Sequence, residues 1–143
     1  MKIVLDTNCL LPALPKNSVC RWLWNAFLEG KYDLFYTTEI LHEYEELMSR
    51  YYSPAAINLT METLLNSFNA YQIIPYYKWN LIHADLDDNK FVDCALNAGA
   101  DFIVTNDKHF NVLKKISFPP IKVINMEDFK KILWQNNYYN PKP

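Results

Sequence analysis

Short apolar runs alternate along this chain with longer stretches in which apolar residues recur at helical spacing. The runs cover residues 3–5, 34–36, 102–104 and 123–124, and residues 71–74 form a further extended segment. Continuous apolar runs of this kind indicate strands that are covered on both faces. The spacing predicts helices near residues 19–28, 38–50, 55–69, 89–98, 111–115 and 126–135. Strands that alternate with helices predict a three-layer α/β/α fold around a doubly wound, mainly parallel sheet.

Capping residues and glycines mark the ends of these predicted helices. Ser53-Pro54 combines a helix cap with a first-turn proline, and Asn125 is placed to cap the last helix. Gly99 stands where the helix near residues 89–98 is expected to stop. The length of the chain suits one domain, which we expect over residues 1–135, followed by a polar tail over residues 136–143.

The composition is that of a globular protein with nearly balanced charge. Half of the 143 residues are hydrophobic, and 14 basic residues stand against 16 acidic ones, which gives a net charge of −2. Without the four carboxylates singled out below, the balance is 14 − 12 = +2, which is compatible with a polyanionic substrate. Only 2 glycines occur, and neither of the common glycine-rich phosphate-binding motifs is present.

The cysteines and the apolar segments indicate the cellular compartment of the protein. Three cysteines without CxxC spacing predict neither a disulfide framework nor a zinc knuckle. The N-terminal apolar run is only three residues long, which fits a strand and not a signal peptide. The longest apolar segments fall well short of the ~20 residues that span a bilayer. We therefore expect a cytoplasmic protein without a membrane partner.

Two aspartates follow directly after predicted strands. Asp6 comes after residues 3–5, and Thr105-Asn106-Asp107 comes after residues 102–104. Parallel strands present their carboxyl ends at one edge of the sheet, where open α/β folds bind ligands, so both carboxylates are expected there. Aspartate is also common in turns after strands, so each position alone has an ordinary structural explanation.

Two further carboxylates are candidates for the same site. Glu43 stands at the edge of the apolar face of its helix, where an ionised carboxylate is costly unless it is paired or bound to a cation. Snorkelling or a salt bridge would explain Glu43 equally well. Asp88 begins the helix near residues 89–98, where aspartate is a preferred cap, and Asp93 is the alternative within that helix.

Four carboxylates in one pocket repel one another unless some are protonated or a cation is present. An all-oxygen set of donors favours hard ions such as Mg²⁺ or Mn²⁺. Such ions polarise a phosphoryl oxygen and lower the pKa of a bound water, so the pattern predicts hydrolysis of phosphodiesters by a metal-activated water. The four residues of this predicted metal site are Asp6, Glu43, Asp88 and Asp107.

The histidines do not fit a metal motif. His42, His83 and His109 are scattered along the chain without zinc-ligand spacing. Each is therefore predicted to be a surface or capping residue and not a catalytic one.

Several short motifs occur in a fixed order along the chain. They are Val4-Leu5-Asp6-Thr7-Asn8, then Glu43 after the second strand, then Asp88-Asn89-Lys90-Phe91 leading into Ala95, and finally GADFIVTND at residues 99–107. This ordered set resembles the PIN domain over almost the whole chain. The resemblance is greatest to the bacterial branch of VapC-like toxins, the toxin components of toxin–antitoxin pairs.

The resemblance implies an endoribonuclease that depends on Mg²⁺ or Mn²⁺, with the four carboxylates named above as metal ligands. Asn8 and Thr105 match polar positions that orient those carboxylates, and Asp93 stays open as an alternative to Asp88. The resemblance further implies a homodimer, RNA as the substrate and a cognate antitoxin protein as the inhibitor. It selects neither a target RNA nor a cleavage site, and it does not distinguish one metal ion from two.

Two other functions compete with the nuclease. A phosphatase with an aspartate nucleophile after the first strand usually needs a second aspartate two residues on, where this chain has Asn8. A non-catalytic, PIN-like binding module would keep the acidic pocket only for protein contacts. Metal-dependent cleavage of RNA separates the nuclease from both.

Overall fold

Five parallel strands form one sheet in the order β3-β2-β1-β4-β5. The computed structural model describes residues 1–138, with side chains described to residue 136. The strands are β1 (Lys2–Leu5), β2 (Asp33–Tyr36), β3 (Ala70–Gln72), β4 (Phe102–Val104) and β5 (Val123–Ile124). The chain adds β2 and β3 on one side of β1, then returns and adds β4 and β5 on the other. The predicted doubly wound sheet is confirmed, and its direction of winding reverses between β1 and β4, where such folds bind ligands.

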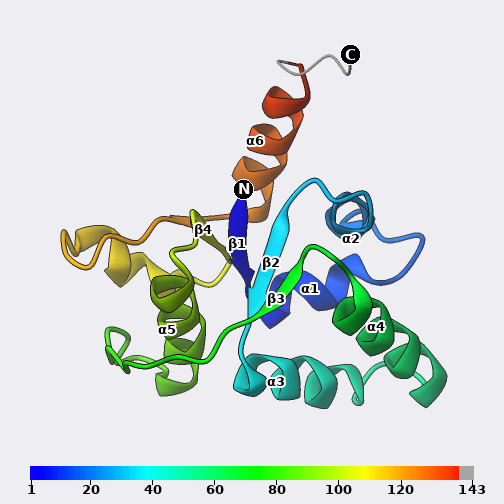
Figure 1. The fold of residues 1–143 in the computed structure, drawn as a ribbon, viewed down its shortest axis with the longest axis horizontal. Coiled ribbons are helices and arrows are strands. Elements are labelled where there is room, and N and C mark those ends of the chain that lie inside the picture. Colours follow the sequence, from blue (N-terminus) through cyan, green and yellow to red (C-terminus); the bar gives the residue numbers. More distant parts are fainter. Residues whose placement is uncertain (139–143) are drawn as a thin grey trace.

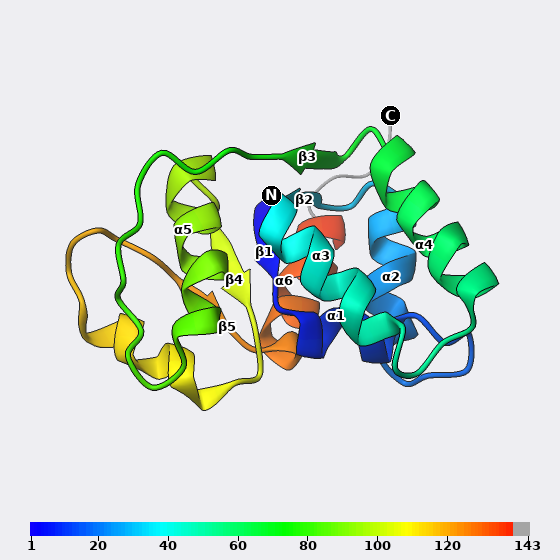
Figure 2. The same cartoon turned by 90° about the horizontal axis from the view of Figure 1, so that it is seen from below.

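Helices cover both sides of this sheet (Figure 1). α5 (Asn89–Ala98) packs against β1, β2 and β4 on one side, whereas α1 (Thr7–Ala13), α2 (Arg21–Leu28) and α4 (Pro54–Asn66) lie on the other. α3 (Thr38–Met48) contacts α1, α4 and α5, and Figure 2 shows it on the same side of the strands as α1 and α4. The remaining helical elements are the 3₁₀ segments η1 (Leu86–Asp88) and η2 (Lys108–Lys115), and α6 (Met126–Tyr138). The predicted three-layer α/β/α architecture is therefore observed.

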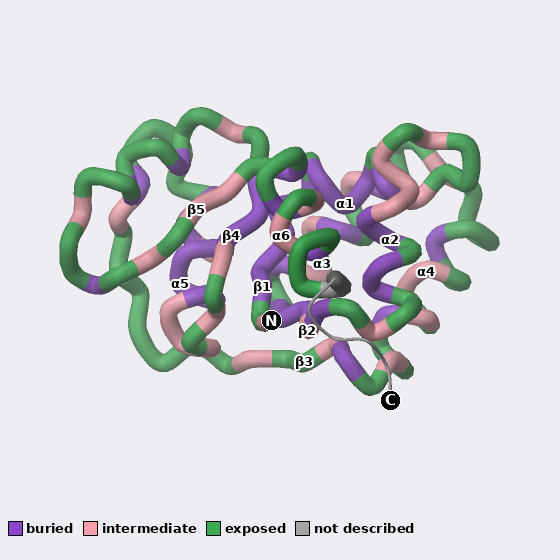
Figure 3. Tube along the Cα trace, turned by 90° about the horizontal axis from the view of Figure 1, so that it is seen from above, coloured by how far each residue is buried: buried purple, intermediate pink, exposed green. Residues whose placement is uncertain are grey.

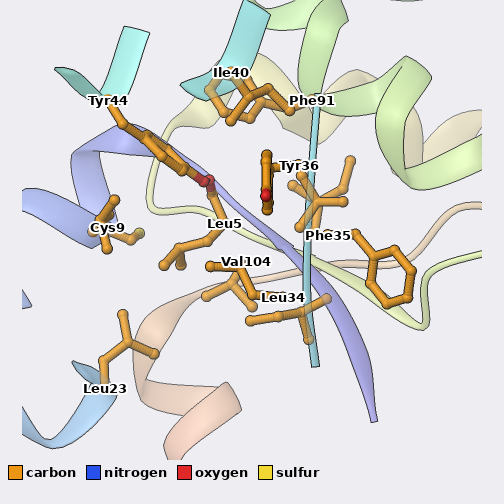
Figure 4. Close-up of a cluster of buried hydrophobic side chains, with 14 of the residues drawn as sticks. Leu5, Cys9, Leu23, Leu34, Phe35, Tyr36, Ile40, Tyr44, Phe91 and Val104 are labelled. Atoms are coloured by element: carbon orange, nitrogen blue, oxygen red, sulfur yellow. The ribbon is translucent and has the colours of Figure 1, made fainter. Parts of the chain in front are cut away.

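The central strands β1 and β4 are buried in the hydrophobic core. In Figure 3 the traces of β1 and β4 are coloured as buried, whereas much of the chain around β3 is exposed. Figure 4 shows the side chains of Leu5, Tyr36 and Tyr44 gathered with Phe91 and Val104 near the carboxyl end of β1. Each fully buried apolar side chain of this size contributes about 1.5–3 kcal/mol. This packing fixes the end of β1, from which the next residue, Asp6, projects.

The predicted helix caps are confirmed. Ser53 Oγ accepts a hydrogen bond from the backbone N–H of Ala56 at 3.2 Å, and Asn125 Oδ1 accepts one from Asp128 at 2.8 Å. Gly99 follows the last residue of α5 with φ +63°, the left-handed conformation that glycine adopts most easily.

Helix α1 was not predicted from the sequence. Its seven residues include Pro12, and a short helix that contains proline has a low intrinsic propensity. Five of the seven residues are buried, including Cys9, Leu10 and Leu11. Tertiary burial therefore stabilises a helix that local sequence signals do not predict.

Several other boundaries differ from the prediction, and α4, for example, ends at Asn66 and not at residue 69. The helix expected near residues 111–115 is the 3₁₀ segment η2, which already begins at Lys108. Helix α6 continues to Tyr138, three residues beyond the predicted end, and the rest of the predicted tail, residues 139–143, lies outside the described residues. None of the helices within residues 1–138 combines the length and apolarity needed to cross a bilayer.

Candidate metal centre

Asp6 occupies the central position of the candidate site, at the junction of β1 and α1. Its side chain is buried, and its Oδ2 accepts a hydrogen bond from Thr105 Oγ1 at 2.7 Å. Burial is the main cause that raises the pKa of Asp6 above its ordinary value, the hydrogen bond from Thr105 lowers it, and the charges of Glu43 and Asp107 raise it. The site therefore holds a carboxylate whose charge is costly without a cation.

Thr105 connects this carboxylate to the next strand of the sheet. The residue lies directly after β4, and its Oγ1 also accepts the backbone N–H of Asp107 at 3.0 Å. The carboxylate of Asp107 in turn accepts the backbone N–H of His109 at 2.9 Å and so caps η2. These hydrogen bonds place the polar ends of β1 and β4 side by side at the point where the winding reverses.

Glu43 reaches the same edge from α3, and two polar groups hold its carboxylate. Thr7 Oγ1 donates a hydrogen bond to Oε2, and Lys90 Nζ lies 2.8 Å from Oε1. The helix itself is anchored because the hydroxyl of Tyr44 donates a hydrogen bond to the backbone carbonyl of Leu5. The salt bridge that the sequence left open for Glu43 is therefore present, with Lys90, which the sequence analysis named only as part of a motif and not as a partner of Glu43.

Asp88 has a buried carboxylate that no hydrogen bond within the described residues stabilises. Only 9% of it is exposed, and its Oδ2 has no hydrogen-bond partner among the described residues. It makes no side-chain cap on α5, so the capping explanation does not hold for its carboxylate. Burial is the main cause that raises its pKa to about 6, the carboxylates of Asp85, Asp107 and Asp6 also raise it, and the nearby ring of His109 lowers it.

Asp93 lies in a different environment. Its Oδ1 accepts the backbone N–H of Trp79 at 2.9 Å, which fixes the loop before η1. Burial raises the pKa of Asp93, the charge of Lys78 lowers it, and the charge of Glu39 raises it. Asp88, and not Asp93, therefore shares its electrostatic environment with the other candidate carboxylates.

Asn8 and His109 were also considered in the sequence analysis, and the structure places both near the candidate carboxylates. Asn8 is exposed, and its backbone N–H is the part that acts on the Asp6 carboxylate. His109 lies at the surface as predicted, but its Nδ1 is 3.4 Å from Asp88 Oδ2 and 3.6 Å from Asp107 Oδ1. The sequence analysis missed these contacts, and the spacing of His109 two residues after Asp107 was the available signal.

The residues present fit a divalent cation. Within residues 1–138, one set of three potential ligands has donor atoms that all lie within 4.8 Å of one another, namely Asp85, Asp88 and His109. The charges of Asp107 and Asp6 act on Asp88, and those of Glu43 and Asp107 act on Asp6. A buried carboxylate oxygen without a partner, beside other carboxylates, is stabilised by protonation or by a bound cation. Oxygen donors of this kind suit hard divalent ions.

The fold and this acidic edge define the class of the protein, a doubly wound α/β domain with a carboxylate-rich site at the reversal point of its sheet. The chain belongs to the PIN domain family, whose sequence profile matches residues 2–109. PIN domains are generally nucleases, and the nucleases among them generally use a divalent metal ion. None of the curated proteins matches the chain in sequence.

Several solved structures share the fold. A chain in the structure of VapBC2 from Rickettsia felis, bound to a DNA fragment from their promoter, is 19% identical with a TM-score of 0.59, covering 87% of this chain and 98% of that one. A chain of FitAB bound to an IR36 DNA fragment is 17% identical with a TM-score of 0.55, covering 86% and 94%. The PIN domain of T. brucei RRP44 is 12% identical with a TM-score of 0.55, covering 95% and 82%. At these identities the likeness establishes the common fold.

Proposed function

We propose that this chain is a Mg²⁺- or Mn²⁺-dependent endoribonuclease whose metal is held by Asp6, Glu43, Asp88 and Asp107. The observation that carries the proposal is the buried Oδ2 of Asp88, which has no partner among the described residues and lies in the field of Asp6 and Asp107. Family membership supports nuclease chemistry, and the RNA substrate and the ion follow from the resemblance of the motifs.

Each polar neighbour of these carboxylates has a task in this mechanism. When bound, the ion supplies polarisation of a phosphoryl oxygen and a water of lowered pKa. Thr105 holds Asp6 in one orientation through its donated hydrogen bond, and Thr7 does the same for Glu43. Lys90 neutralises part of the negative charge of Glu43, which reduces repulsion of a phosphate group approaching the edge of the sheet.

Substitution of Asp6 by asparagine tests the proposal, with Asp101→Asn as the matched control. Asp101 is exposed and accepts the backbone N–H of Lys2 at the opposite edge of the sheet, a contact that asparagine preserves. With Mg²⁺ or Mn²⁺ and a structured RNA, Asp6→Asn should lower cleavage by about 100-fold or more, since loss of even an outer partner of a metal ligand costs about 10–100-fold. Asp101→Asn should cleave like the parent.

Two results would overturn the nuclease assignment. Cleavage by Asp6→Asn at the parental rate would mean that the site is wrong, and undiminished cleavage in excess chelator would remove the metal. Absence of any metal-dependent cleavage would favour the non-catalytic binding module. Hydrolysis of a phosphomonoester with a trapped aspartyl-phosphate would favour the phosphatase.

We further propose that the chain forms a homodimer and is inhibited by a cognate antitoxin protein. The fold shared with chains of the two-component assemblies VapBC2 and FitAB supports this proposal. A groove of about 610 Å³ between α2 and α4 offers apolar side chains to a partner, among them Trp24, Leu28 and Leu59. Light scattering on the purified chain should give about twice its 16.9 kDa mass, and a monomer would contradict the dimer. A cytoplasmic location stays a prediction.

A further inference from the structure

His109 brings a nitrogen donor to the carboxylates at the edge of the sheet. Its backbone N–H donates to Asp107 Oδ1 at 2.9 Å, and this hydrogen bond fixes the main chain of His109 beside the site. The ring Nδ1 lies 3.4 Å from Asp88 Oδ2 and 3.6 Å from Asp107 Oδ1. About half of the side chain is exposed, which leaves a path for an ion from solvent.

The distance between the His109 ring and Asp88 is long for a hydrogen bond and suits two donors of one ion. An N–H···O hydrogen bond has its optimum at about 2.9–3.0 Å, and Asp88 Oδ2 has no hydrogen-bond partner among the described residues although His109 lies 3.4 Å away. Two donors that share a tetrahedral ion at about 2.0–2.1 Å lie about 3.3–3.4 Å apart. The imidazole and the carboxylate therefore already have the separation of neighbouring ligands.

The buried oxygen of Asp88 is an independent sign of a ligand at this point. Asp88 is 9% exposed as a residue and 12% exposed in its side chain, and its buried Oδ2 lies 3.4 Å from Nδ1 of His109. Such an atom needs a proton or a cation to offset the loss of water. Asp85 completes the set, since one donor atom from each of the three residues lies within 4.8 Å of the others.

We propose that Asp85, Asp88 and His109 form a mixed nitrogen–oxygen site for a borderline divalent ion of the Zn²⁺ class, which shares Asp88 with the carboxylate site proposed above. Imidazole nitrogen suits zinc and similar ions, whereas Mg²⁺ takes oxygen ligands almost exclusively. Neutral His109 would bind through Nδ1 and keep its proton on Nε2 toward solvent. The inference deepens the proposed function, on which its catalytic meaning rests, while ion binding itself is measured without RNA.

Titration of the full chain with Zn²⁺ and, separately, with Mg²⁺ tests this site. The variant is His109→Ala, and His83→Ala is the matched control because His83 is an exposed histidine in the loop before η1. By calorimetry, His109→Ala should lose Zn²⁺ affinity by about tenfold or more and keep Mg²⁺ affinity within about twofold. His83→Ala should bind both ions like the parent.

Nuclear magnetic resonance gives a readout that a change in folding would not imitate. In ¹⁵N spectra of the histidine rings, Zn²⁺ should shift Nδ1 of a single histidine, and His109→Ala should lack that signal. His109→Asp, which replaces the nitrogen by oxygen, should bind Mg²⁺ at least as tightly as the parent and show no shifted ring. Equal Zn²⁺ affinity in parent and His109→Ala, or a shift confined to His42 or His83, would overturn the site.

The outcomes separate this inference from the nuclease proposal. If Asp6→Asn abolishes cleavage while His109→Ala binds Zn²⁺ like the parent, only the zinc-class site is wrong. If the ring of His109 shifts with Zn²⁺ but no ion supports RNA cleavage by the parent, only the nuclease proposal is wrong.

Discussion

Thr105 shows how one hydroxyl holds two elements of the site. It donates to Asp6 Oδ2 and accepts the backbone N–H of Asp107, and it is almost fully buried. Thr105→Val keeps the shape and removes both hydrogen bonds, so we expect a loss of about 1–3 kcal/mol of unfolding free energy and a further rise in the pKa of Asp6. Urea unfolding at neutral pH measures the first effect.

A threonine on a helix surface provides the control for this substitution. Thr60 Oγ1 donates to the Ala56 carbonyl within α4, at the surface and away from the candidate site. Thr60→Val should change the unfolding free energy by no more than about 0.5 kcal/mol. If both valine variants lose the same small amount, the hydroxyl of Thr105 does not organise the site.

The raised pKa of Asp88 makes the stability of the metal-free protein depend on pH. Because the pKa of the folded state, about 6, exceeds the ordinary value of 3.8, the folded state binds the proton more tightly than the unfolded state. The stabilisation is therefore complete below about pH 4 and is lost as pH rises through 6. After allowance for solvent screening, the loss amounts to about 1–2 kcal/mol.

Asp88→Asn isolates this contribution from those of other titrating groups. The asparagine cannot ionise, so the difference in unfolding free energy, variant minus parent, should increase between about pH 4 and 6 and stay level above that. Urea unfolding in the presence of a chelator measures this difference. A difference that decreases with pH would mean that the carboxylate of Asp88 is stabilised in its charged form.

Positions at the ends of strands could be predicted from the sequence, whereas the partners of those residues could not. Asp6 and Asp107 follow apolar runs, and the geometry of a parallel sheet brings the ends of such runs together. Lys90 of α5 contacts Glu43 of α3, and His109 of η2 contacts Asp88 of η1. The periodicity of the sequence does not predict these contacts. Their positions depend on packing between elements that are distant in sequence.

At the scale of elements, local signals decided some boundaries and tertiary packing decided others. Ser53 and Asn125 act through hydrogen bonds to residues three positions away, so their caps are visible in the sequence. Helix α1 has no such signal, and it forms because Cys9, Leu10 and Leu11 are buried against the core. Asp6 follows the first strand, as predicted, although the helix that begins after it was not predicted.

The end of α5 provides a prediction at this scale. Gly99 has φ +63°, and a Cβ placed there would meet no atom within 4 Å, so only the backbone conformation disfavours a side chain. Gly99→Ala should therefore cost about 1 kcal/mol of unfolding free energy. Gly99→Asn should cost less, because asparagine tolerates the left-handed conformation. Equal losses for alanine and asparagine would show that backbone conformation is not the cause.

At the scale of the molecule, the candidate site is a junction of four parts of the chain. Asp6 follows β1, Glu43 lies on α3, Asp88 ends η1 before α5, and Asp107 follows β4. An ion bound by all four would link elements from both sides of the sheet. Binding to the folded state alone raises the unfolding free energy by RT ln(1 + [L]/Kd), which is about 2.7 kcal/mol at a hundredfold excess over Kd.

The parent and Asp6→Asn should therefore exchange their order of stability when metal is added. Without metal at neutral pH, asparagine removes a buried charge whose pKa burial and neighbouring carboxylates raise, so the variant should melt a few degrees higher. With saturating Mg²⁺ or Mn²⁺ the parent should gain several degrees and the variant little, since the variant lacks a ligand. Thermal melts with chelator and with each ion give both orders. If the variant remains more stable than the parent at saturating metal, Asp6 is not a ligand. In that case the ion does not stabilise the parent enough to offset the charge repulsion that asparagine removes from the variant.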